Sequence, residues 1–273
     1  FGGKMEKNIA NIRRNIIKVG LTCKGKVHWG SSLSCVEIMY VLYGIVTNVS
    51  NNEISDSERD QIIVSKGQGA LAMYAAMHEA GMIGDDFISD FQGNGSDFSE
   101  EIIMNDKMKI PCSTGSLGIG MPYAVGVALR KKRRGEAGKV YTVVGDGECD
   151  EGSIWEAAMC ASHYGLNNLV MIIDHNGLQA DGDIEKVMKI GDVGQKFLSF
   201  GWDISVVEGH NCEALVKALS VSREKPYAII ANTIKGKGIS FMENQYLWHD
   251  HTLDNNLLEQ ACREVGLEYA TKE

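Results

Sequence analysis

Proline is scarce in this chain of 273 residues, which contains only three, and this excludes collagen-like segments, proline-rich linkers and most low-complexity designs. No run approaches the roughly 18 apolar residues of a membrane-spanning helix, and we see no signal-peptide pattern. The seven cysteines form no Cys-x-x-Cys pair. We therefore expect reduced thiols and a cytoplasmic protein that does not bind a membrane.

Positive charge is also in short supply. Lysine and arginine number 27 against 36 acidic residues, which gives a net charge of −9 and argues against nucleic acid or an anionic membrane as partner. The one basic run, residues 131–134, ends an apolar-periodic segment and precedes Gly135. We interpret it as the last turn of a helix, where cations interact favourably with the helix dipole and glycine ends the helix.

Glycine, by contrast, is abundant, with 31 residues. Such an excess predicts tight turns, or backbone that approaches a ligand closely. Residues 1–4 precede Met5 and look like a cloning remnant, so we expect a single domain over residues 5–273.

Apolar periodicity predicts two N-terminal helices, one ending near Gly20 and one over residues 35–46, followed by an alternation of strands and helices. The expected strands are 61–65, 140–144, 169–174, 204–207 and 227–231, and the expected helices are 69–80, 120–134, 152–164 and 213–221. This order predicts an α/β fold with a doubly wound, mainly parallel sheet covered by helices on both faces. In such sheets ligands bind beyond the carboxyl ends of the strands.

The turn after the strand 140–144 reads Gly-Asp-Gly-Glu-Cys-Asp-Glu-Gly. It could be a plain strand-to-helix turn whose acids suit the helix dipole, or a dinucleotide turn with Asp174 as the ribose-binding acid. The spacing is not Gly-x-Gly-x-x-Gly, and the carboxylates at 146, 148, 150 and 151 would repel a bare diphosphate. A divalent cation reverses that repulsion, so we predict a metal-bridged diphosphate site.

A second metal ligand should follow a neighbouring strand. Asn176 follows the strand 169–174 and lies about 30 positions after Asp146. Its amide oxygen suits Mg²⁺, although Asn-Gly is also an ordinary turn dipeptide.

Gly145-Asp146-Gly147 followed by Asn176 resembles the motif that binds thiamine diphosphate (ThDP). Four further segments, 27–31, 65–69, 113–120 and 233–244 with Trp248-His249, occur in the matching order. Across residues 5–273 the chain resembles the N-terminal half of transketolase, in the form in which the enzyme is split into two chains.

The resemblance implies ThDP with Mg²⁺ or Ca²⁺ as cofactors. Asp146, Asn176 and the carbonyl of Leu178 would hold the metal, and Gly147 would donate its N–H to the diphosphate. The remaining expected cofactor contacts are Gln68, Lys235 and His249, the aminopyrimidine-lining residues Gly115, Ser116 and Leu117, and Glu151 at an interface between two active sites. Taken alone, a lysine or histidine such as these is more often solvated or structural.

The resemblance further implies transfer of a two-carbon ketol unit from a ketose to an aldehyde. His28 and Ser31 would face the substrate, with His28 as the leading general acid–base and His249 as the second. The glutamate that activates the cofactor belongs in this family to a pyrimidine-binding domain. We therefore expect a partner chain, a dimer of heterodimers, and no activity from this chain alone.

Two features depart from the family pattern. Gln68 stands where the family has histidine, and residues 95–108 contain no His-Pro pair upstream of the Thr-Gly-Ser-Leu-Gly turn. Because those histidines serve sugar hydroxyls in the family, the donor and acceptor sugars stay open. The alternatives are another ThDP-dependent carboligase or decarboxylase subunit, and a non-catalytic ThDP-binding subunit.

Overall fold

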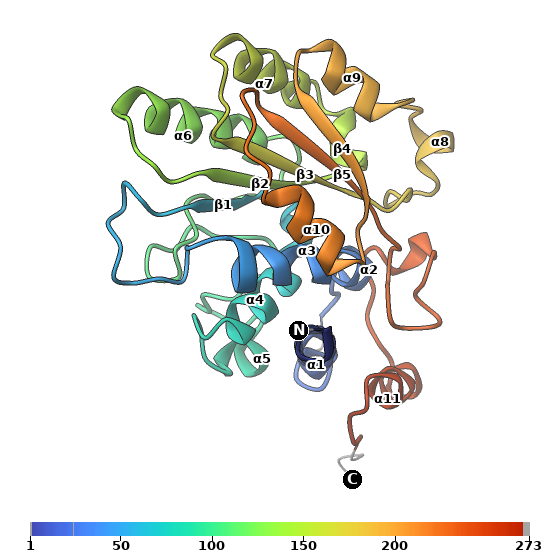
Figure 1. The fold of residues 1–273 in the computed structure, drawn as a ribbon. Helices are drawn as coiled ribbons and strands as arrows, with labels where there is room; N and C mark the ends of the chain where they lie inside the picture. The colour runs from blue at the N-terminus through green and yellow to red at the C-terminus, as the bar shows by residue number, and fades with distance from the viewer. Residues whose placement is uncertain (1, 24, 270–273) are drawn as a thin grey trace.

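A five-stranded parallel sheet forms the centre of the computed structural model, which describes residues 2–23 and 25–269 (Figure 1). The strands lie in the order β1-β2-β3-β5-β4, and every neighbouring pair is parallel. Their bounds are β1 (Gln61–Val64), β2 (Val140–Gly145), β3 (Leu169–His175), β4 (Asp203–Glu208) and β5 (Tyr227–Asn232). The predicted α/β class and parallel sheet are confirmed.

Helices cover both faces of this sheet, as a doubly wound fold requires (Figure 1). One face packs on α6 (Gly120–Arg134), α7 (Gly152–His163) and α9 (Val193–Ser199), and the other on α3 (Val36–Val41), α4 (Ala70–Glu79) and α10 (Cys212–Leu219). From β2 to β3 the chain moves across the sheet in one direction, and from β4 to β5 it moves across the sheet in the opposite direction. Since parallel crossovers are right-handed, this reversal places α7 and α10 on opposite faces.

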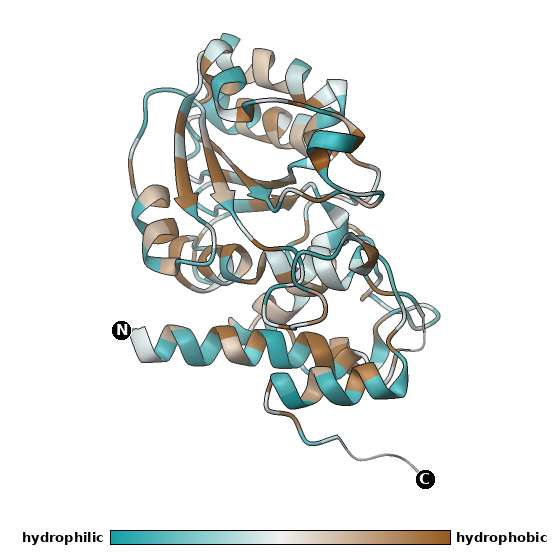
Figure 2. Ribbon diagram, turned by 90° about the vertical axis from the view of Figure 1, so that its right-hand side faces the viewer, coloured by the Kyte–Doolittle hydropathy of each residue, from teal (hydrophilic) through white to brown (hydrophobic). Residues whose placement is uncertain are grey.

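A further layer of helices lies below α3 and α4. It contains α1 (Gly2–Val19), α5 (Asp86–Asp90) and α11 (Asn255–Glu264), and Figure 2 shows α1 and α11 side by side with apolar stripes between polar turns. The short helices α2 (Trp29–Ser34) and α8 (Ile184–Val187) complete the set. Residues 2–4, which we set apart as a cloning remnant, are helical here and continuous with α1.

The segment 35–46, expected to be one buried helix, is divided. α3 ends at Val41, and Leu42–Val46 continues as a π-helical turn with wider hydrogen-bond spacing. The apolar periodicity also did not predict the short 3₁₀ turns at Gly67–Gly69, Gly147–Asp150 and Tyr246–Trp248. A single turn contains too few residues to show an apolar repeat. Within residues 2–23 and 25–269, no helix has both the length and the apolar character to cross a bilayer.

The carboxyl ends of β1, β2, β3 and β5 lie along one edge of the sheet. In the register of the sheet, Gly145 pairs with Asp174, and Asp174 in turn pairs with Ala231. The residues that follow these strands are therefore neighbours in space, although they are far apart in the sequence.

Candidate functional site

A cavity of about 160 Å³ opens at this edge of the sheet. Every loop that follows β1, β2, β3 and β5 contributes to its walls. Among its lining residues are Ser31, Lys66, Gln68, Leu117, Asp146, Gly147, Glu148, Asn176, Leu178, Lys235 and His249. The structure thus brings together most of the site residues that the sequence predicted.

Asp146 fixes the turn after β2 against the turn after β3. Its carboxylate accepts a hydrogen bond of 2.8 Å from the N–H of Gly147 and one of 2.6 Å from the N–H of Gly177. Only 4% of the residue is exposed, and burial together with the nearby charge of Asp174 raises the pKa of Asp146. The N–H of Gly147, expected to donate to a diphosphate, is engaged by Asp146 in this structure.

Asn176 and Leu178 form a tight turn beside Asp146. The amide oxygen of Asn176 accepts from the N–H of Leu178 at 3.1 Å, and the carbonyl of Leu178 faces the ammonium of Lys235 at 3.2 Å. The three predicted metal ligands therefore offer carboxylate, amide and carbonyl oxygens around one cavity. Oxygen donors of this kind suit Mg²⁺ and Ca²⁺, so the donor set fits the implied cation.

Lys235 is a buried cation in the wall of the cavity. Its ammonium contacts the carbonyls of Leu178 and Gln179 at 3.2 Å and Nδ1 of His249 at 3.0 Å. Burial, followed by repulsion from Lys66, lowers the pKa of Lys235 to about 8. Burial and the charge of Lys235 lower the pKa of His249 to about 3, so this imidazole is neutral at physiological pH.

Lys66 was not recognised as a site residue from the sequence, although it lies inside the segment 65–69. Its ammonium pairs with the carboxylate of Asp174 and donates to the carbonyl of Ser31 at 3.0 Å. Asp174, considered above as a ribose-binding acid, is completely buried in this pair. The dinucleotide interpretation of Asp174 is therefore wrong.

The four acidic side chains of the 145–152 turn have different surroundings in the structure. Glu148 points inward, where it accepts from the hydroxyl of Ser65, from the N–H of Gly118 at 2.9 Å and from the N–H of Gly145 at 3.1 Å. It thus connects three separate turns. Asp150 accepts from Gln179 at 2.7 Å, and Glu151 is exposed. The four carboxylates do not converge on one point as the sequence suggested: Asp146 accepts from Gly177 in the Asn176 turn, and Asp150 accepts from Gln179 directly after that turn.

The residues predicted to line an aminopyrimidine ring differ in their exposure. Gly115 has φ of 141°, a conformation that favours glycine, and its carbonyl accepts from Gln68 at 3.3 Å. Leu117 lines the cavity, whereas Ser116 is exposed. Glu151, expected at an interface, lies against Gly118.

The two predicted substrate residues occupy different places. Ser31 lines the cavity. His28 is not among the lining residues but contacts the cavity-lining His249, and the two rings lie edge to face with centroids 5.2 Å apart. Nδ1 of His28 lies 2.9 Å from Oε1 of Glu100. Glu100 therefore lies next to the expected acid–base residue, and no sequence motif predicted this contact.

Glu101 is a second carboxylate that the sequence interpretation missed. Its Oε1 lies 3.5 Å from the side-chain nitrogen of Gln68, and burial raises the pKa of its carboxyl. It belongs to the segment 95–108, which lacks the expected His-Pro pair. The two departures from the family pattern thus meet in space.

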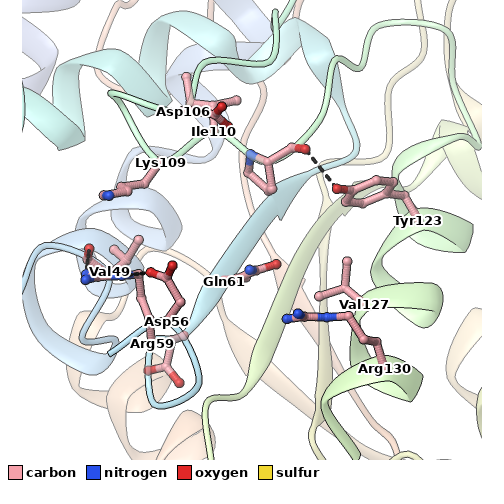
Figure 3. A pocket seen from close by; sticks show the side chains of 12 residues that line it. Val49, Asp56, Arg59, Gln61, Asp106, Lys109, Ile110, Tyr123, Val127 and Arg130 are labelled. Atoms are coloured by element: carbon pink, nitrogen blue, oxygen red, sulfur yellow. Dashed lines mark hydrogen bonds and ion pairs between the residues drawn. The ribbon is translucent and has the colours of Figure 1, made fainter. Parts of the chain in front are cut away.

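A second cavity, of about 490 Å³, lies at the amino end of β1 (Figure 3). Arginine, lysine and aspartate side chains of both signs line it, and Tyr123 donates to the carbonyl of Pro111 at 2.9 Å across one wall. None of the predicted site residues lies there. Since the cavity opens at the opposite end of the sheet from the carboxyl ends, it is not the site indicated by the motifs.

Comparison with known proteins agrees with this geometry. Residues 5–272 match the family described as transketolase, thiamine diphosphate binding domain. An apulose-4-phosphate transketolase subunit of Actinobacillus succinogenes is 36% identical over 264 residues, covering 96% of each chain. The 6-deoxy-6-sulfo-D-fructose transketolase subunit SqwG of a Clostridium species is 34% identical, again over 96% of each chain.

Longer transketolases match over part of their length. Human transketolase is 35% identical over 268 residues, which cover 97% of this chain and 43% of that protein. The crystal structure of transketolase from Campylobacter jejuni superposes with a TM-score of 0.86 at 25% identity, covering 97% of this chain and 43% of the other. The chain belongs to the transketolase family, as a thiamine diphosphate-binding N-terminal subunit of the kind found in its split, two-chain members.

Proposed function

We propose that this subunit holds ThDP through a divalent cation, Mg²⁺ or Ca²⁺, bound by Asp146, Asn176 and the carbonyl of Leu178. The observation that carries the proposal is the hydrogen bond of 2.6 Å from the Gly177 N–H to Asp146, which fixes the two ligand-bearing turns against each other. When bound, ThDP supplies a thiazolium that stabilises the carbanion produced by cleavage of a ketose.

Lys235 supplies the positive charge for the diphosphate. Within the described residues its ammonium is hydrogen-bonded to two backbone carbonyls and to His249, and none of these three partners carries a negative charge. His249, whose pKa is lowered by burial and by the charge of Lys235, is neutral and available as a hydrogen-bond partner for phosphate or substrate oxygen. Gly147, Gln68 and the backbone of residues 115–117 complete the expected cofactor contacts.

His28 is the proposed proton-transfer residue for substrate oxygen. Its Nδ1 lies 2.9 Å from a carboxylate oxygen of Glu100, and such a contact orients the ring. Ser31 presents a hydroxyl to the same cavity. We propose transfer of a two-carbon ketol unit between a ketose and an aldehyde, with the identity of both sugars left to the assay below.

The site is proposed to be completed by a partner chain with a pyrimidine-binding domain, in a dimer of heterodimers. Large apolar side chains are exposed beside the segments that line the cavity, with Ile119 at 53% and Leu247 at 62% exposure. Ile119 follows the cavity-lining Leu117, and Leu247 precedes His249. Apolar surface of this kind marks protein interfaces, and Glu151 lies against the neighbouring turn at Gly118.

The proposal also covers the domain organisation and the cellular location of the protein. Residues 5–273 act as one ThDP diphosphate-binding domain, and the protein works in the cytoplasm. Cytoplasmic thiols stay reduced, and the cysteines at 35, 112, 149, 160, 212 and 262 form no disulfide.

The decisive experiment is reconstitution. The chain is purified alone and together with the pyrimidine-domain chain that we expect to be encoded nearby, and each sample is assayed with ThDP, Mg²⁺ and a panel of ketoses and aldehydes. We expect turnover only from the complex. Turnover by the isolated chain would contradict the half-site proposal. A complex active on 2-oxo acids alone would identify a carboligase or decarboxylase, and ThDP binding without turnover would identify a non-catalytic subunit.

A further inference from the structure

His28, Glu100 and Asp250 bring three potential metal ligands together beside the cofactor cavity. One nitrogen or oxygen atom from each side chain lies within 4.8 Å of those from the other two. Nδ1 of His28 and Oε1 of Glu100 are 2.9 Å apart, a separation compatible with two ligands bound to one ion at about 2.0–2.1 Å. Within residues 2–23 and 25–269, no other trio of histidine, cysteine, aspartate or glutamate side chains converges in this way.

The polar atoms of this cluster are buried without hydrogen-bond partners. In the described part of the chain, no hydrogen bond engages Nδ1 of His28, Oε1 of Glu100 or Oδ1 of Asp250. Even the close pair of Nδ1 and Oε1 lacks the geometry of a hydrogen bond. Burial of a polar atom without a partner is costly, so three such atoms in one cluster require an explanation. A metal ion that accepts a lone pair from each would satisfy all three.

The backbone holds two of these side chains opposite each other. Val27 and His251 form an antiparallel bridge, with hydrogen bonds of 3.1 and 3.2 Å between their backbone groups. His28 follows the first of these residues and Asp250 precedes the second, so the two lie across from each other as cross-strand neighbours do. The indole of Trp29 donates to the carbonyl of His251 at 2.8 Å and strengthens the same connection. The two side chains are thus positioned before any ion binds.

The charge of the cluster also favours a cation. Glu100 and Asp250 bring two carboxylates close together. Nζ of Lys26 lies 3.4 Å from Oδ2 of Asp250, but the Lys26 side chain is 68% exposed, so this ion pair is weak. It also does not engage Oδ1 of Asp250. A divalent cation between the carboxylates relieves their repulsion more effectively than an exposed lysine does.

The types of ligand determine which ion fits. Mg²⁺ and Ca²⁺ prefer oxygen ligands throughout, whereas one imidazole nitrogen with two carboxylates suits Zn²⁺ and its first-row neighbours. Three protein ligands leave the fourth position of a tetrahedral Zn²⁺ to water. The cluster therefore differs in chemistry from the Asp146 site, whose proposed ligands are all oxygen atoms.

We propose that His28, Glu100 and Asp250 form a second metal site, which binds Zn²⁺ through Nδ1 of His28 and one oxygen of each carboxylate. The site itself goes beyond the proposed function, and its effect on turnover rests on that function. An imidazole whose Nδ1 is bound to a metal keeps its proton on Nε2 and has no lone pair for another. Bound Zn²⁺ therefore prevents proton transfer by His28 and inhibits the complex.

The binding test uses the isolated chain with excess Mg²⁺ and without ThDP. Calorimetry measures the affinity for Zn²⁺, and Co²⁺ serves as a coloured substitute whose visible absorption distinguishes nitrogen and oxygen ligands from cysteine thiolates. We expect a single Zn²⁺ site without thiolate ligands. Glu100→Gln and Asp250→Asn should each weaken Zn²⁺ binding at least about tenfold, since losing a direct ligand should cost no less than losing a group behind one.

Matched controls separate this site from adventitious binding. Asp97→Asn removes an exposed carboxylate from the same segment as Glu100, and His163→Gln removes an exposed imidazole. Neither should change the affinity for Zn²⁺, and Asp146→Ala should also retain it. The melting temperature of each variant establishes that it is folded. Unchanged affinity in either Glu100→Gln or Asp250→Asn, or loss of binding in Asp146→Ala, would overturn the proposed site.

The inhibitory role is tested in the reconstituted complex with saturating Mg²⁺. Zn²⁺ should inhibit the wild type over the concentration range in which it binds the isolated chain. Asp250→Asn, which leaves His28 in place, should keep its basal turnover and require at least about tenfold more Zn²⁺ for inhibition. Equal inhibition of both complexes would overturn the inhibitory role, while the calorimetry still decides the site. A wild-type complex without turnover would contradict the proposed function alone.

Discussion

Lys66 and Asp174 form an ion pair beneath the cofactor cavity, with side chains only 5% and 0% exposed. Asp174 also accepts from the hydroxyls of Ser34, at 2.5 Å, and Thr233. Burial acts to raise the pKa of this carboxyl, but the charge of Lys66 and the hydrogen bonds outweigh burial and hold it below its ordinary value. The pair anchors the loop after β1 to the end of β3, and so supports two walls of the site.

The first prediction concerns the stability of this pair. Either Lys66→Met or Asp174→Asn leaves a buried charge without its partner, so each should lower the free energy of unfolding by about 3–5 kcal/mol. The double variant should lose less than the sum of the two, because neither charge is then orphaned. Urea unfolding of the isolated chain measures these values.

A surface ion pair provides the matched control. Lys189 and Glu185 are 72% and 50% exposed at a separation of 2.7 Å. Glu185→Gln should change the stability by less than about 0.5 kcal/mol. Equal effects at the buried and exposed pairs would contradict the role assigned to Lys66 and Asp174.

The second prediction concerns metal-dependent cofactor binding. Asp146→Ala removes the only carboxylate among the three proposed metal ligands, so ThDP binding should fall at least about 100-fold in the presence of Mg²⁺. Isothermal titration calorimetry with and without EDTA measures the effect. Asp150→Asn, which alters an acid bound to Gln179, should change the affinity far less. ThDP binding that survives in Asp146→Ala would remove the metal assignment.

The third prediction concerns pH. In the free chain Lys235 has a pKa of about 8, whereas a bound diphosphate favours its charged form and raises that pKa. Binding at pH above about 8 therefore takes up a proton, and the affinity for ThDP should fall by up to about tenfold per pH unit in that range.

Lys235→Met isolates this effect. The variant should bind ThDP more weakly at every pH, with a flat profile between about pH 7.5 and 9.5, because its side chain does not titrate. A slope identical to that of the wild type would assign the pH dependence to another group.

The fourth prediction concerns the connection between three turns. Glu148 accepts hydrogen bonds from Ser65, Gly118 and Gly145, and Glu148→Gln exchanges one acceptor oxygen for a donor nitrogen. We expect a loss of about 1–3 kcal/mol in the free energy of unfolding, together with weaker ThDP binding. Glu156→Gln, an exposed change on α7, is the control. Lower ThDP affinity without lower stability would indicate that Glu148 acts on the ligand instead.

The fifth prediction concerns thermal stabilisation of the chain by Mg²⁺ and ThDP. Because Mg²⁺ and ThDP together bind the folded chain, they should raise its melting temperature in a concentration-dependent way, and EDTA should reverse the shift. ThDP stabilisation that is insensitive to EDTA would contradict the proposed metal bridge.

Several elements could be predicted from the sequence because their signals are local. α6 spans Gly120–Arg134 as predicted, and β2, β3 and β5 begin at the predicted residues. The proximity of Asp146 and Asn176 was also predictable, since both follow strands of a parallel sheet whose carboxyl ends share one edge. The division of residues 35–46 was not, because a π-helical turn preserves the apolar composition of the helix that it continues.

What the sequence by itself determined was the order of strands and helices, the cofactor motif and the residues that could reach the cofactor. Only the tertiary structure decided which of the carboxylates connect distant segments of the fold. Glu148 meets Ser65 across 83 positions, Lys66 meets Asp174 across 108, and Gln68 meets Glu101 across 33. Such contacts leave no local pattern, because the direction of a side chain at a turn is set by the distant backbone and charges packed against it.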